Sequence, residues 1–193
     1  MEILSKLLGT PARVKLMRLF LLNQGKGFNN KEIIKISRVS PSIVRKEISL
    51  LASVGFIKKR AEEWHFNGAF KYTKEFERLL ITSDTLDKEL ILNDFKKVGK
   101  LKLLLVSGLF IKKDDSRVDM LIVGDKLNKG KIEKEIKKLE AEIGKELVYA
   151  LFDSKEFNYR LSMYDKLVRD ILDFPHEIIF QTKELSTQAL KKD

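Results

Sequence analysis

Two dipeptides in the first third of the chain, Thr10-Pro11 and Ser40-Pro41, predict where two helices begin. In each pair a side-chain oxygen can accept a hydrogen bond from a free backbone N–H group, and proline suits the first helical position. Apolar residues follow the first pair at helical spacing and end near Asn23. The second helix is predicted to end at about Val54, because Gly55 is a typical C-terminal stop.

A third helix and a hairpin complete this part of the chain. Asn29-Asn30 is a capping signal for a short helix over residues 31–37. Apolar residues in the segments 56–60 and 64–67 predict two strands, joined by a turn at residues 61–63. We therefore expect three helices followed by a β-hairpin, which is the order of elements in a winged helix.

The helix after Ser40 has two different faces. Val44, Ile48 and Leu51 recur at spacings of four and three and form one buried face. The opposite face carries short polar side chains and cations, which suit phosphate and base-edge contacts in a major groove. Together with the basic run of the hairpin, this face supplies the candidate DNA-binding residues, which are Ser40, Ser42, Arg45, Lys46, Ser49, Lys58, Lys59 and Arg60.

The positive charge of the chain is concentrated in the same region. Residues 1–72 hold 14 Lys and Arg against 5 Glu, a net charge of +9 out of a total of +10. Residues 73–193 hold 24 basic and 23 acidic residues, which nearly cancel. A basic unit of this size favours a polyanionic partner, and double-stranded DNA is the first candidate.

Residues 40–60, from Ser-Pro-Ser-Ile-Val-Arg-Lys to Gly-Phe-Ile-Lys-Lys-Arg, resemble the recognition helix and first wing strand of ArsR and MarR-like regulators of bacteria and archaea. The resemblance covers about residues 1–70. It implies a winged helix-turn-helix domain over residues 1–72 that binds an operator as a homodimer. Winged helices also serve as protein-interaction modules, and a basic helix is often only a solvated face. A protein-binding role and a surface without a nucleic-acid partner therefore stay open as alternatives to DNA binding.

Residues 73–98 are predicted to form a helical connector. Thr73 begins one helix, and a second is expected over residues 85–98, with Leu86, Leu90, Ile91 and Phe95 on its apolar side. The domain boundary is expected near residue 84. Such helices either dimerise or dock on the second domain, and the sequence leaves both alternatives open.

Residues 99–182 predict a small mixed-sheet α/β domain, so the whole chain belongs to the α+β class. Residues 100–106 and 118–123 are nearly continuous apolar runs, as expected for strands covered on both faces. A helix over 128–143, a strand over 146–152 and helical segments over 155–163 and 164–172 follow. A polar tail occupies residues 183–193.

The run Leu-Leu-Leu-Val-Ser-Gly-Leu-Phe, with Asp-Ser-Arg-Val-Asp-Met-Leu-Ile-Val-Gly-Asp after it, looks like the glycine turn and the S-D-x-D strand of the minimal nucleotidyltransferases. The resemblance spans about residues 100–152 and implies transfer chemistry with two divalent metals held by carboxylates. Ser107 and Gly108 occupy the turn, and Arg117 and Asp119 occupy the two carboxylate positions.

The resemblance is incomplete at the residues that perform the chemistry. Arg117 replaces the first carboxylate, where a cation repels Mg²⁺ and is expected to form an ion pair with Asp119. A third carboxylate has no clear counterpart, and Asp114 and Asp115 are either metal ligands or ordinary solvated turn formers. We therefore predict no catalytic residue, no metal and no cofactor, and a domain that senses a ligand or docks a protein. A dimerisation domain without a ligand is the alternative.

Other compositional features restrict the remaining classes of function. The chain has no Cys and only His65 and His176, which argues against disulfides and against Cys or His metal clusters. No apolar run approaches the roughly 20 residues that span a bilayer, and the first residues lack the pattern of a signal peptide. We expect a cytoplasmic transcriptional regulator without a membrane segment. An active nucleotidyltransferase and an antitoxin-type protein that binds a protein partner remain the alternatives.

Overall fold

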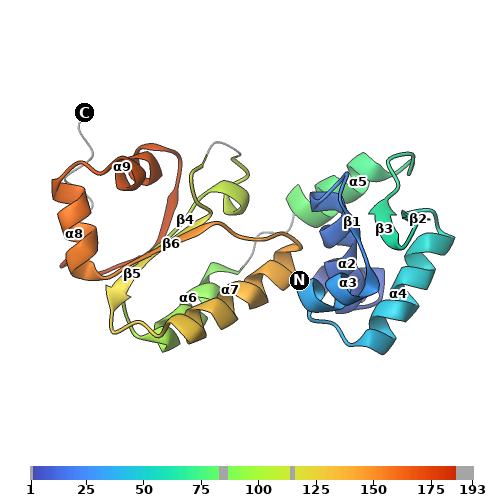
Figure 1. The fold of residues 1–193 in the computed structure, drawn as a ribbon, viewed down its shortest axis with the longest axis horizontal. Helices are drawn as coiled ribbons and strands as arrows, with labels where there is room; N and C mark the ends of the chain where they lie inside the picture. The colour runs from blue at the N-terminus through green and yellow to red at the C-terminus, as the bar shows by residue number, and fades with distance from the viewer. Residues whose placement is uncertain (1, 83–86, 114–115, 186–193) are drawn as a thin grey trace. The chain divides into compact units, whose positions relative to one another are not determined.

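The computed structural model describes residues 2–82, 87–113 and 116–185. The protein contains helices and two separate sheets, which confirms the predicted α+β class (Figure 1). It divides into two compact units. Unit 1 comprises Met1–Thr85 and Ile136–Glu146, and unit 2 comprises Leu86–Glu135 and Leu147–Asp193.

Unit 1 is mainly helical, with a small antiparallel sheet of strand order β1-β3-β2. Its strands are β1 (Gly27–Phe28), β2 (Ile57–Arg60) and β3 (Glu63–Phe66). Its helices are α1 (Glu2–Leu8), α2 (Pro11–Leu22), α3 (Asn30–Ser37), α4 (Pro41–Ser53), α5 (Thr73–Glu77) and the π-helical turn Arg78–Thr82. The three predicted helices and the predicted hairpin are present, whereas α1 and β1 were not predicted.

The helix starts follow the predicted capping signals with one exception. Thr10 accepts a hydrogen bond from the backbone N–H of Arg13, and Asn29 forms a capping box at the start of α3. Ser40 makes no side-chain bond to the backbone of α4, and its hydroxyl lies 3.4 Å from the hydroxyl of Ser42. The prediction that Ser40 caps this helix through its side chain is therefore wrong, although α4 begins at the following proline as expected.

The core of unit 1 fixes α4 in place and includes the segment after the hairpin. Val44, Ile48 and Leu51 are buried, which confirms the predicted inner face of α4. The π-helical turn brings Leu80 into the same core, and its carbonyl accepts a hydrogen bond from Nε of Arg18 at 2.9 Å. The first half of the predicted connector is thus an integral part of this unit.

Unit 2 is built on a four-stranded mixed sheet of order β6-β5-β4-β7. Its strands are β4 (Lys100–Val106), β5 (Met120–Asp125), β6 (Tyr149–Phe152) and β7 (Glu177–Gln181). Strand β4 is antiparallel to β5 and β7, whereas β5 and β6 are parallel. The first three strands were predicted and β7 was not.

Helices cover both faces of this sheet. They are α6 (Lys88–Phe95), the first half of α7 (Lys129–Ile143), α8 (Ser154–Ser162) and α9 (Lys166–Asp173), with 3₁₀ turns at Lys96–Val98 and Gly108–Phe110. The second half of α7, from Ile136, belongs to unit 1. Figure 1 shows α8 and α9 on one side of the sheet and α6 with the start of α7 on the other. On the α8 and α9 side, Leu103 and Leu105 of the sheet pack with Phe157, Val168 and Ile171.

Several predictions for the connector and the loops need correction or lie outside the structure. On α6, Ile91 and Phe95 are buried as expected, but Leu90 is 63% exposed and does not join them. The predicted boundary near residue 84, Leu86, Asp114 with Asp115, and the end of the tail from residue 186 lie outside the described residues.

No helix within the described part of the chain is both long enough and apolar enough to cross a membrane.

Candidate functional site

Helix α4 presents its polar face to solvent. Ser42, Arg45, Lys46 and Ser49 are all exposed, and Ser40 is exposed immediately before the helix. The structure therefore places four of these candidates on the exposed side of one helix, opposite the apolar face that packs on the core, with Ser40 immediately before the helix.

The two cations of this face are not neutralised by the protein. Arg45 and Lys46 make no hydrogen bond or ion pair with any residue in the ranges 2–82, 87–113 and 116–185. Two consecutive exposed cations that pair with no carboxylate among the described residues leave a positive potential that attracts an anionic partner.

A buried carboxylate that sequence analysis missed anchors the same helix. Glu47 is 1% exposed and accepts hydrogen bonds from Oγ1 of Thr10 at 2.9 Å and from Nε of Arg13 at 2.7 Å. These bonds join the middle of α4 to the start of α2, so the exposed face of α4 is held in a fixed position. The available signal was an acidic residue on the otherwise apolar side of the predicted helix.

The three cations of the hairpin are divided between two faces. Lys59 and Arg60 are exposed and Lys58 is half-buried. Successive side chains of a strand point to opposite faces, so Lys58 and Arg60 share a face and Lys59 lies on the other. Nζ of Lys59 lies 3.7 Å from a carboxylate oxygen of Glu62 in the turn, which partly neutralises it.

The aromatic residue of the hairpin packs inward. Trp64 is half-buried against the core of unit 1, and its Nε1 donates a hydrogen bond to Oδ1 of Asn30 at 3.1 Å. Trp64 therefore packs beneath the hairpin. The neighbouring His65 lies within 3.5 Å of the Glu63 carboxylate.

An apolar stripe also lies on the surface of α4, and sequence analysis did not single it out. It consists of Ile43, Leu50 and Val54, which are 44%, 38% and 57% exposed. Residues at these spacings of seven and four lie on the same side of a helix. The stripe borders the polar face that carries Arg45 and Lys46.

In unit 2, the predicted transferase residues lie together but are tied into the fold. Both oxygens of the Asp119 carboxylate accept backbone N–H groups, one from Leu109 and one from Val148, each at 2.9 Å. The hydroxyl of Ser107 donates to the carbonyl of Val118. Gly108 has φ +55°, and a Cβ atom there would lie 2.2 Å from Oδ1 of Asp119. The turn is closed tightly around this carboxylate.

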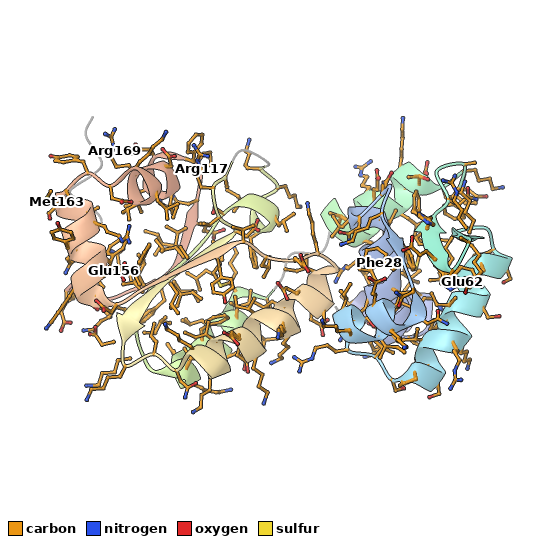
Figure 2. The ribbon with its side chains drawn as sticks, viewed as in Figure 1. Phe28, Glu62, Arg117, Glu156, Met163 and Arg169 are labelled. Atoms are coloured by element: carbon orange, nitrogen blue, oxygen red, sulfur yellow. The ribbon has the colours of Figure 1, made fainter. Side chains whose placement is uncertain are left out.

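Arg117 does not form the predicted ion pair with Asp119. Its Nε lies 2.9 Å from Oδ2 of Asp170 on α9, and Figure 2 shows Arg117 close to this helix. Two causes explain the difference. Both residues precede β5, so strand alternation does not place them on one face, and Asp119 is already bound by backbone N–H groups.

Within residues 2–82, 87–113 and 116–185, no three His, Asp or Glu side chains are grouped in a way that could hold a metal ion. Asp114 and Asp115, for which metal binding and an ordinary loop role were both open, lie outside these residues.

A cavity of about 630 Å³ lies at a different edge of the sheet from the predicted transferase residues. It opens at the carboxyl ends of the parallel strands β5 and β6, where small-molecule sites often occur in α/β sheets. Lys126 and Lys129 line it together with three carboxylates and two aromatic side chains, which are Glu133, Asp153, Glu156, Tyr149 and Phe152. Sequence analysis missed this cavity, because it depends on which strands are parallel neighbours.

Comparison of the chain with protein-family models, curated proteins and solved structures gives no match.

Proposed function

We propose that the chain is a sequence-specific, DNA-binding transcriptional regulator, in which unit 1 is a winged helix-turn-helix domain and α4 enters the major groove. The order α2, α3, α4 and then the hairpin of β2 and β3 supports this assignment. The observation that carries it is the pair of exposed cations, Arg45 and Lys46, without a protein partner among the described residues.

The dimensions and side chains of α4 suit this role. The major groove is about 12 Å wide, and a helix with its side chains is about 10–12 Å across. The face opposite the core carries Ser42 and Ser49, whose small side chains permit a close approach to DNA. Arg45 and Lys46 then lie within reach of phosphates and bases. Lys58 and Arg60 of the hairpin supply further phosphate contacts.

Charge reversal on α4 tests the proposal. A duplex is first selected from a randomised library by the full-length protein, and its affinity is then measured by fluorescence anisotropy over a range of salt concentrations. The double variant Arg45→Glu with Lys46→Glu is expected to bind at least about 100-fold more weakly. Its plot of log K against log salt is expected to flatten by about 2 if each cation neutralises one phosphate.

A second double variant separates local contacts from net charge. Lys155→Glu with Lys166→Glu changes the net charge by the same amount at two exposed positions on α8 and α9. This control is expected to bind the selected duplex nearly as tightly as the wild type. Equal losses in both double variants, or no loss in the α4 variant, would refute the assignment of α4 as the recognition helix.

The proposal includes binding as a homodimer to a palindromic operator. A dimer of such domains contacts two half-sites separated by about 10 base pairs, one turn of DNA. Inserting about five base pairs between the half-sites turns them to opposite sides of the duplex, and affinity should then fall sharply. Sedimentation of the free protein and of its complex measures the stoichiometry. Binding as a homodimer is contradicted if one chain binds each duplex and the affinity is unchanged after the insertion.

We further propose that unit 2 is a non-catalytic sensing or docking domain related to the nucleotidyltransferases. The hydrogen bonds at Asp119 and the pairing of Arg117 with Asp170 support it, because these groups serve the fold. The cavity beside Lys126 and Lys129 has the size of a small-molecule site and supports sensing. Incubation with labelled nucleoside triphosphates and Mg²⁺ tests whether unit 2 is non-catalytic. Incorporation of label above that of heat-unfolded protein would show that it is catalytic.

A further inference from the structure

The first turn of α4 holds an apolar side chain beside the proposed DNA contacts. Ile43 is the third residue of the helix and is 44% exposed. Its sequence neighbour Ser42 is exposed and polar, and Lys46 lies one turn further along on the same side. Ile43 therefore adds an uncharged, water-excluding contact to a surface that otherwise offers hydroxyl groups and cations.

The other members of the apolar stripe lie further along the helix. With a rise of about 1.5 Å per residue, Leu50 is about 10 Å and Val54 about 16 Å beyond Ile43. The N-terminal residues of a recognition helix are the ones that contact base edges. Ile43, in the first turn, is therefore the member of the stripe closest to the base edges, and Leu50 and Val54 lie progressively further from them.

The chemistry of the groove identifies the group that Ile43 can contact. Every base edge in the major groove offers hydrogen-bond donors or acceptors, and an isoleucine side chain leaves these unsatisfied. The exception is the 5-methyl group of thymine, which is the one apolar group that the four base pairs present there. The same methyl group occurs in 5-methylcytosine.

We propose that Ile43 contacts the 5-methyl group of a thymine in the major groove, and so selects this base at one position of each half-site. The inference rests on the proposed function, because it requires α4 to enter the groove. The free cations Arg45 and Lys46 provide the charge complementarity that brings this helix to DNA.

Replacing thymine by deoxyuridine tests the contact, because the two bases differ only in the 5-methyl group. Each thymine of the selected duplex is replaced in turn, and affinity is measured for the wild type, Ile43→Ala and Leu50→Ala. At one position of each half-site, the wild type is expected to lose roughly fourfold in affinity, the effect of removing one buried methyl group. Ile43→Ala should bind both duplexes equally, whereas Leu50→Ala should retain the difference.

A second substitution identifies the methyl group independently of the base. Placing cytosine at the sensitive position weakens binding, and 5-methylcytosine there should recover part of the loss for the wild type but not for Ile43→Ala. Ile43 is half exposed, so its truncation is not expected to unfold the protein, and circular dichroism checks this.

The outcomes distinguish this inference from the proposed function. If the wild type binds no duplex, both are wrong. If it binds but no deoxyuridine substitution matters, or Ile43→Ala still distinguishes thymine from deoxyuridine, DNA binding stands and the methyl contact is wrong. If Ile43→Ala alters self-association in sedimentation without altering this discrimination, the stripe is a protein-binding face and the inference is again wrong.

Discussion

Replacing Asp119 by alanine should destabilise unit 2, because this carboxylate holds three segments of the unit together. It accepts the backbone N–H of Leu109 after β4 and that of Val148 before β6. A hydrogen bond to a charged group contributes about 1.5–3 kcal/mol. Val148 is 59% exposed and Leu109 is half-buried, so we expect the bond to Leu109 to contribute the larger share. We therefore expect Asp119→Ala to lower the free energy of unfolding by about 2–3 kcal/mol.

Urea unfolding followed by two signals measures this loss. The chain has a single tryptophan, Trp64 in unit 1, so its fluorescence follows unit 1 while far-ultraviolet circular dichroism follows both units. In Asp119→Ala, unit 2 should unfold at a lower urea concentration. This change should be seen in the dichroism but not in the Trp64 fluorescence. Asp170→Ala is the matched control, since it removes an ion pair with Arg117, which is 56% exposed, and should cost less than about 1 kcal/mol.

The opposite result would show that the carboxylate has a different role. Catalytic carboxylates that face an open site are commonly costly to stability, and their removal leaves a protein equally or more stable. An Asp119→Ala protein as stable as the wild type would therefore refute the argument that this residue serves the fold.

Two further predictions concern stability. Gly108→Ala should cost about 1–3 kcal/mol, because φ is +55° and the new Cβ would lie 2.2 Å from Oδ1 of Asp119. In the same urea titration, the double variant Gly108→Ala with Asp119→Ala should lose less stability than the two single variants lose together, because the new Cβ then no longer meets the Asp119 carboxylate. Glu47→Ala should lower the stability measured by Trp64 fluorescence by about 2–3 kcal/mol, less than for a fully buried pair because Arg13 is 25% exposed. Glu47→Gln should cost less, and equal costs would contradict a role for its hydrogen bonds.

Most helices of unit 1 could be predicted because their signals are local. The N-cap at Asn29, the proline at position 41 and Gly55, whose φ is +73°, act within one turn of the chain. Strand β1 could not be predicted, because two residues are too short to show alternation. Strand β7 pairs with β4, more than 70 residues earlier, and an isolated apolar run does not reveal such a partner.

The same distinction explains which parts of the sites were predictable. The exposure of Arg45 and Lys46 follows from helical periodicity, because a helix with one apolar face exposes the other. The pairing of Arg117 with Asp170 depends on where α9 packs against the sheet, and no local pattern contains that information. Helical periodicity places Glu47 on the buried side of α4, but its pairing with Thr10 and Arg13 requires knowing that α2 begins beside the middle of α4.

The cations of unit 1 thus fall into two groups by what surrounds them. Arg13 is bound to Glu47 and to the carbonyl of Leu8, so its charge is used to position α4. Arg45 and Lys46 lie on the same helix as Glu47 but meet no carboxylate within the described ranges. Glu47 of α4 neutralises one cation with its buried carboxylate, whereas the described part of the chain leaves the two cations on the outer side of the helix unneutralised. Their charge is therefore available for an external anion. These two cations, unpaired among the described residues, are the observation that supports the proposal of DNA binding at that face.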